Sequence, residues 1–122
     1  MSNAQFLEFC HHNLVTDNES DLTSTVAADV LVIPTDNPYV AKTTGADAEA
    51  LTLANGEPGQ ILIINLVTDG NGTGTLTPAT STGFSTIAFA DAGDQAILLY
   101  VNDTIGWMII SVFGLTAQPT VA

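Results

Sequence analysis

The chain has 122 residues, with 13 acidic side chains against a single basic one, Lys42, and a formal net charge of −12. This length suits one domain. Hydrophobic residues make up 46% of the sequence, which is enough apolar material for a core and excludes the disordered class. Because the chain cannot neutralise a series of phosphates, we expect neither nucleic acid nor an anionic membrane as a partner.

The cysteine content and the amino terminus bear on where the chain is made. Its one cysteine, Cys10, cannot form a disulfide within the chain, so no oxidising compartment is indicated. The first residues carry neither a basic region nor an uninterrupted apolar region, and they do not read as a signal peptide. The longest apolar runs, such as 61–64 and 107–110, fall far short of the roughly 20 residues that a membrane-spanning helix needs. We therefore expect synthesis in a cytoplasm and no membrane association.

Residues 1–48 predict an extended N-terminal arm. Residues 16–25 are polar and acidic, and only residues 29–33 resemble a strand, so we expect one or two short strands here. Three large apolar side chains stand beside this polar stretch: Phe6, Leu7 and Phe9. A chain terminus rarely keeps such side chains in water, so they either dock on a partner or pack onto the chain's own core.

Residues 49–114 have strand character, with short runs of β-branched and aromatic residues between turn residues. We expect strands over residues 51–53, 60–68, 73–77, 84–89, 95–101 and 107–113. Such spacing predicts an all-β fold, an antiparallel β-sandwich or a barrel-like domain. Residues 115–122, around Pro119, are expected to form a C-terminal tail.

Two connections and one strand face carry specific expectations. The sequence Asp-Gly-Asn-Gly at 69–72 predicts a hairpin between its flanking strands. The short connection 102–106 places Tyr100 and Trp107 roughly across from one another, as a stabilising aromatic pair. Ile87 and Phe89 are two residues apart, so they share the core-facing side of their strand.

Metal chemistry has little support in the sequence. Residues 69–74 match the first half of a calcium loop, but Thr80 stands where the loop needs a glutamate. A weak divalent site that Asp69 shares with other chains remains the alternative to a plain hairpin turn. His11 and His12 are the only histidines, and adjacent side chains on a strand point to opposite faces. We expect no metal centre and no cofactor.

Catalytic chemistry is equally unsupported. A nucleophile needs a neighbouring base and a third group to orient that base, and residues 49–114 contain no histidine. Asp91, Asp94 and Asp103 are candidates for paired-carboxylate chemistry, but carboxylates at turns usually hold the backbone and bind water. We expect no catalytic residues and no enzyme.

The order of turns and strands over residues 50–114 resembles small structural proteins of tailed bacteriophages, namely capsid decoration (cement) proteins and head-fibre modules. The segments that carry the resemblance are 59–61, 66–70, 75–78, 86–89, 92–94, 98–100 and 106–107. The resemblance implies a β domain that forms a homotrimer on the exterior of a virion capsid and binds the major capsid protein.

The apolar strands also exceed what one small sandwich can cover, which favours a subunit interface. We expect this oligomer interface to involve Ile61, Ile63, Trp107, Ile109 and Phe113. Capsid binding is expected to use Phe6, Leu7 and Phe9 of the arm. The alternative function is a glycan- or receptor-binding module of a phage fibre or a surface adhesin, which would use turn residues such as Asn71, Asp91 and Asp103 with an exposed aromatic side chain.

Overall fold

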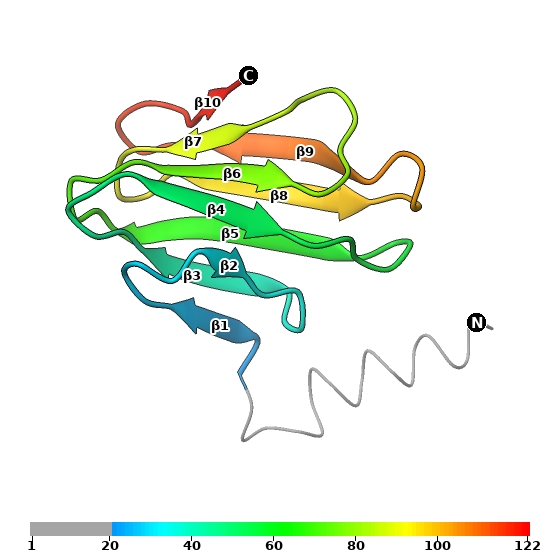
Figure 1. Ribbon diagram of the computed structural model, residues 1–122, viewed down its shortest axis with the longest axis horizontal. Coiled ribbons are helices and arrows are strands. Elements are labelled where there is room, and N and C mark those ends of the chain that lie inside the picture. The colour runs from blue at the N-terminus through cyan, green and yellow to red at the C-terminus, as the bar shows by residue number, and fades with distance from the viewer. Residues whose placement is uncertain (1–20) are drawn as a thin grey trace.

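The computed structural model describes residues 21–122 as strands and loops in two facing five-stranded sheets (Figure 1). The strands are β1 (Thr23–Val26), β2 (Val32–Ile33), β3 (Tyr39–Thr43), β4 (Glu49–Leu53), β5 (Ile61–Thr68), β6 (Gly74–Pro78), β7 (Ile87–Phe89), β8 (Gln95–Tyr100), β9 (Trp107–Phe113) and β10 (Thr120–Val121). Sheet A has the strand order β1-β3-β5-β8-β9, and sheet B has the order β10-β7-β6-β4-β2. The expected all-β, sandwich-like fold is confirmed, and neither sheet closes into a barrel.

The first six strands alternate between the sheets and pair in parallel with their neighbours in each sheet. The chain therefore winds as a flattened coil of three rungs: β1 with β2, β3 with β4, and β5 with β6 (Figure 1). The later pairings, which involve β7 to β10, are antiparallel. The predicted antiparallel sandwich is thus correct for the second half of the fold and wrong for the coil, because apolar alternation does not encode strand direction.

Residues 21–48 lie in the sandwich itself. They contribute β1, β2 and β3, where the sequence predicts one or two short strands in an extended arm. Val26, Ile33 and Val40 from these strands are buried in the common core. The remainder of the predicted arm, residues 1–20, lies outside the described residues, and with it Phe6, Leu7 and Phe9.

The core fills the space between the two sheets. Ile87 and Phe89 point into it, as predicted. Tyr100 and Trp107 are cross-strand partners of β8 and β9, with ring centroids 5.1 Å apart in an edge-to-face arrangement, which confirms the predicted hairpin and its aromatic pair. The indole nitrogen of Trp107 donates to the carbonyl oxygen of Ala54 at 2.9 Å, so the buried side chain leaves no polar group unpaired.

The Asp-Gly-Asn-Gly segment does not form the predicted hairpin. It carries the chain from β5 in sheet A to β6 in sheet B and stacks on the loop between β3 and β4. A Cβ atom on Gly70 would lie 2.2 Å from the carbonyl oxygen of Thr44, and one on Gly72 would lie 2.0 Å from that of Asp47. These glycines therefore permit the close approach of two loops, a role that sequence alone does not separate from a hairpin turn.

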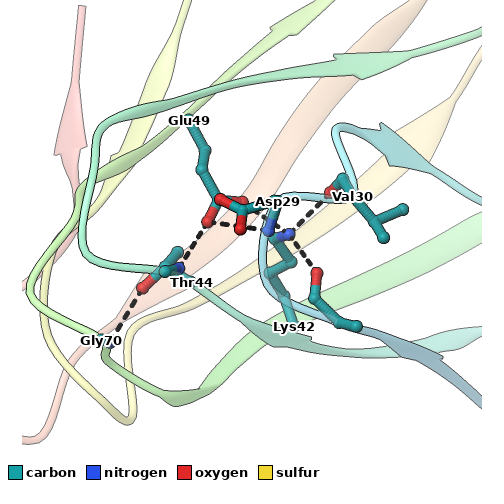
Figure 2. Close-up of polar contacts among 8 residues, drawn as sticks. Asp29, Val30, Lys42, Thr44, Glu49 and Gly70 are labelled. Carbon is teal, nitrogen blue, oxygen red and sulfur yellow. Dashed lines mark hydrogen bonds and ion pairs between the residues drawn. The ribbon is translucent and has the colours of Figure 1, made fainter.

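A buried ion pair lies beside these stacked loops (Figure 2). Lys42 of β3 and Glu49 of β4 point between the sheets, and Lys42 Nζ lies 2.7 Å from Glu49 Oε1. Lys42 also donates to the carbonyl oxygens of Ala27, at 2.9 Å, and Val30, at 2.6 Å. The one basic side chain of the protein thus ties the loop between β1 and β2 to the second rung.

The carboxylate of Glu49 completes this network. Its Oε2 accepts hydrogen bonds from the backbone N–H groups of Gly45 and Asp29. Burial alone would raise the pKa of Glu49, but the hydrogen bonds from Lys42, Gly45 and Asp29 outweigh it and lower the pKa. Glu49 is therefore ionised at neutral pH, and both charges of the pair are paired and hydrogen-bonded as buried charges require.

Candidate functional site

Two of the carboxylates that the sequence offers for chemistry, those of Asp94 and Asp69, hold the backbone of turns. Asp94 is buried, and its Oδ2 accepts from the backbone N–H groups of Ala90 and Asp91 at 2.9 and 3.1 Å. Asp69 Oδ1 accepts from the N–H of Asn71 at 2.8 Å. Within residues 21–122, no group of three or more histidine, cysteine, aspartate or glutamate side chains could hold a metal ion.

Asp103 has a different partner, the phenol of Tyr100, which donates to its Oδ1. Burial, this hydrogen bond and the carboxylate charge together raise the pKa of Tyr100 to about 12. Tyr100 and Trp107 are both fully buried, so neither ring is accessible to stack against a sugar. The turn residue Asp103 thus holds the hydroxyl of a core side chain.

The surface with the strongest binding character is the outer face of sheet A, meaning the side that faces away from sheet B. Its cross-strand neighbours are large and apolar: Ile61 of β5 pairs with Leu99 of β8, which pairs with Met108 of β9. A second row places Ile63 beside Ile97. The first row is thus apolar across three strands, whereas the second ends at Ser111 of β9, the partner of Ile97.

Much of this face is in contact with solvent. The exposed fractions are 40% for Ile61, 43% for Val67, 39% for Met108, 54% for Ile110 and 53% for Phe113. A contiguous apolar surface of this kind on one side of a sheet is characteristic of an interaction site.

Charge separates the faces of the sandwich from its ends. The charged side chains that lie in strands, Lys42 and Glu49, are both buried. Every other described charged residue lies in a loop: Asp21, Asp29, Asp36, Asp47, Glu57, Asp69, Asp91, Asp94 and Asp103. The outer face of sheet A therefore carries no charge, and the negative charge gathers at the strand ends.

The outer face of sheet B is also uncharged but has a different composition. Its side chains are mostly small or hydroxylated, as in Ala50 and Thr52 of β4 and Thr75 and Thr77 of β6. Threonine hydroxyls remain well hydrated, so this face has less to gain from leaving water. The contrast singles out sheet A as the candidate interaction face.

The predicted oligomer-interface residues divide between this face and the core. Ile61 and Phe113 are exposed on the outer face of sheet A, and the partly buried Ile63 belongs to the same face. Trp107 and Ile109 belong to the other side: Trp107 is fully buried, and Ile109 packs against the core. These two residues therefore do not contribute to the outer face of sheet A.

A β-bulge in β9 puts Phe113 on a different face from Trp107 and Ile109. Ile97 pairs with Ser111, but the next residue, Leu98, pairs with Ile109, so Ile110 is an extra residue in the ladder. An extra residue reverses the alternation of side chains along the rest of the strand. Phe113 consequently faces outward although it has the same parity as Trp107 and Ile109.

Sequence reasoning also missed members of the outer face. Ile97 and Leu99 lie on it, and the alternation of β8 carries the signal, since Ala96, Leu98 and Tyr100 between them are all buried. Tyr39 of β3 borders the face, where its hydroxyl accepts a hydrogen bond from Asn65 at 2.7 Å. Tyr39 stood in the predicted arm, so no sheet neighbour was expected for it.

The sequence matches no protein-family model, and it matches no curated protein. The described part of the chain holds no helix that is long and apolar enough to cross a membrane.

Proposed function

We propose that this protein is a non-enzymatic structural component of a tailed-phage virion that binds the outside of the capsid as a homotrimer and stabilises the shell. The observation that carries the proposal is the uncharged, apolar outer face of sheet A on a chain with a net charge of −12. Copies of such a chain repel one another, and an uncharged apolar face is where the burial of apolar surface can offset that repulsion. Three copies that meet through this face keep their acidic loops apart.

The resemblance over residues 50–114 supports the choice of three copies and of a capsid as the partner. A cyclic trimer matches the local threefold positions of a capsid lattice, where it contacts several subunits of the major capsid protein. A ligand that binds only the assembled lattice stabilises that lattice by mass action. Strong acidity keeps free copies dispersed before they bind, and it costs nothing on the outer surface of a shell whose nucleic acid lies inside.

The N-terminal segment supplies the proposed grip on the capsid. Phe6, Leu7 and Phe9 form an apolar group near the start of the chain, and β1, the first described strand, follows that segment at one edge of sheet A. In this proposal the outer face of sheet A joins the copies, and the segment around Phe6 binds the major capsid protein.

Co-sedimentation with phage heads that lack the protein tests the proposal. The full chain should sediment with the heads and saturate at a fixed number of copies per capsid subunit. Ile61→Asp places a charge on the outer face of sheet A and should abolish trimer formation and weaken sedimentation. Thr52→Asp, on the outer face of sheet B, is the matched control and should behave as the parent protein. Absence of sedimentation by the parent chain, with binding to glycans, would favour the fibre or adhesin alternative.

A further inference from the structure

The coil of parallel rungs has one open end. β1 is an edge strand of sheet A and β2 is an edge strand of sheet B, so the first rung has a neighbour on one side only among the described residues (Figure 1). At the opposite end of the coil, β8 covers β5 and β7 covers β6 with antiparallel pairs. The first rung therefore presents backbone groups that a further strand can pair with.

The hydrogen bonds identify those groups. The N–H of Tyr39 donates to the carbonyl oxygen of Leu22 at 3.2 Å, so the backbone of Leu22, and of every second residue after it, faces β3. The backbone groups of Thr23 and Thr25 consequently face away from the sheet. The N–H of Thr23 is held by Asp21 Oδ1 at 2.8 Å, which leaves the N–H and carbonyl of Thr25 as the central groups of the edge that have no partner among residues 21–122.

Apolar side chains surround this edge and remain in water. The exposed fractions are 40% for Leu22, 47% for Val30, 42% for Leu31 and 64% for Val32. They belong to the first rung and its approaches, and none of them lies on the outer face of sheet A. They are separate from the surface assigned to trimer formation, and Val32, which pairs with Thr52, belongs to the outer face of sheet B.

Acidic side chains flank the same rung. Asp21 precedes β1 and is exposed, and Asp36 is exposed beside β1, where it accepts a hydrogen bond from the hydroxyl of Ser24 at 3.3 Å. Asp29 is exposed in the loop between β1 and β2. The one nearby cation, Lys42, is buried and already paired with Glu49.

We propose that the edge of β1 binds an extended segment of a partner protein that carries lysine or arginine between apolar residues. The backbone of this segment adds as a strand along Thr23 and Thr25, one of its apolar side chains covers Leu22, and its cations meet Asp21 and Asp36. This mode of recognition takes affinity from main-chain hydrogen bonds and specificity from alternate side chains.

Two other occupants of the β1 edge are a second copy of this chain and its own residues 1–20, and charge argues against both. A second copy would bring Asp21, Asp29 and Asp36 against the same residues of its own edge, and like charges repel across such a contact. Residues 1–20 of the chain carry Glu8, Asp17 and Glu19 and no lysine or arginine, so they have the wrong sign as well. The acidic edge therefore complements a partner segment with positive charge. The inference does not depend on a capsid, since any partner with such a segment satisfies it.

The probe is a synthetic peptide of seven residues that alternates lysine and valine, with both termini blocked. We would titrate it into the full-length, isotope-labelled chain and follow the backbone amides by NMR at low ionic strength. The amide signals of Thr23 and Thr25 should shift, and the Thr25 amide should exchange with solvent rapidly before the peptide is added and slowly afterwards. A peptide with glutamate in place of lysine should bind at least about fivefold more weakly.

Two variants separate the backbone and charge contributions. Thr25→Pro removes the outward N–H, which an edge strand tolerates, and should weaken the lysine peptide by roughly fivefold, whereas Thr25→Val should not. The double substitution Asp21→Asn and Asp36→Asn keeps the acceptor oxygens and should abolish the difference between the two peptides. It also keeps the inference testable if Thr25→Pro fails to fold.

Four results would overturn the inference. One is equal binding of the two peptides by the parent chain, and another is amide shifts confined to other strands. A third is slow exchange of the Thr25 amide that depends on protein concentration, because a second copy would then occupy the edge. The fourth is tighter peptide binding after Phe6, Leu7 and Phe9 are replaced by alanine, because the N-terminal segment would then be the occupant. Sedimentation with phage heads is measured separately, so the two proposals can fail independently, and only the fourth result would also bear on the capsid grip assigned to Phe6, Leu7 and Phe9.

Discussion

The buried pair of Lys42 and Glu49 makes a sharp prediction about stability. Lys42→Met removes the cation but keeps much of the side-chain volume, and it leaves the Glu49 carboxylate buried between the sheets without its charged partner. The carbonyl oxygens of Ala27 and Val30 also lose their donor. Breaking a buried pair in this way costs about 3–5 kcal/mol, so the substitution should remove much of the free energy of unfolding.

A second variant separates the buried charge from the rest of the network. The double substitution Lys42→Met and Glu49→Gln removes both charges but keeps an acceptor oxygen for the N–H groups of Gly45 and Asp29. At pH 7 the order of stability should be parent, then double variant, then Lys42→Met. The order follows because an unpaired buried charge costs more than a neutral amide at the same place.

The contribution of Glu49 to stability depends on pH. The pKa of Glu49 is lowered in the folded protein, so its contribution to stability is present above the usual glutamate pKa and is lost as the pH falls below about 4. Burial raises the pKa of Glu49, and the hydrogen bond from Lys42 is the strongest interaction that lowers it. Without that hydrogen bond, the pKa of Glu49 in Lys42→Met should be higher than in the parent. The stability gap between the two proteins should therefore be largest at neutral pH and shrink as the pH falls.

Urea unfolding followed by fluorescence provides the assay, because Trp107 is the one tryptophan and is fully buried. The urea midpoint of Lys42→Met at pH 7 should fall by more than about 1 M. A loss of less than about 1 kcal/mol, or a Lys42→Met protein more stable than the double variant, would refute the reasoning, because the pair would then be as replaceable as one at the surface.

Three further predictions concern the loops, the core and the N-terminal segment. Gly72→Ala should destabilise the fold by more than Gly59→Ala, because a Cβ on Gly72 meets the Asp47 carbonyl oxygen at 2.0 Å whereas one on Gly59, at φ +90°, meets nothing within 4 Å; equal urea midpoints would contradict this. The stability that Tyr100 contributes should be complete below about pH 10 and fall as the pH rises toward 12, because the phenol ionises at a lower pH in the unfolded chain. An ultraviolet titration in which Tyr100 ionises at its ordinary pKa would count against the buried hydrogen bond to Asp103. Replacing Phe6, Leu7 and Phe9 with alanine should leave the urea midpoint unchanged and reduce sedimentation with phage heads, and undiminished sedimentation would exclude them from the capsid contact.

The class of the fold could be predicted from sequence because alternation and turn residues report local geometry. Ile87, Phe89, Tyr100 and Trp107 lie where their spacing predicted. Strand direction could not be read in the same way, because the Asp-Gly-Asn-Gly segment suits a hairpin and a crossover between sheets equally well. The contact that decides between them, Gly72 against the Asp47 carbonyl oxygen, joins residues 25 positions apart.

The candidate site was predicted in part for a related reason. Ile61 and Ile63 follow from simple alternation, but the bulge at Ile110 reverses the face of Phe113 relative to Trp107 and Ile109. No residue in the sequence of β9 predicts this bulge, since Ile110 is as apolar as its neighbours. Lys42 was likewise noted only as the single cation, and its place in the core depends on Glu49 from the next strand.

Cryo-electron microscopy of phage heads incubated with the protein is the most direct test of the central proposal. The proposal predicts density for three copies around each threefold position on the outside of the capsid, with the outer faces of sheet A toward one another and the N-terminal segment on the shell. Heads without such density, or single copies that contact the shell through the outer face of sheet A, would contradict it.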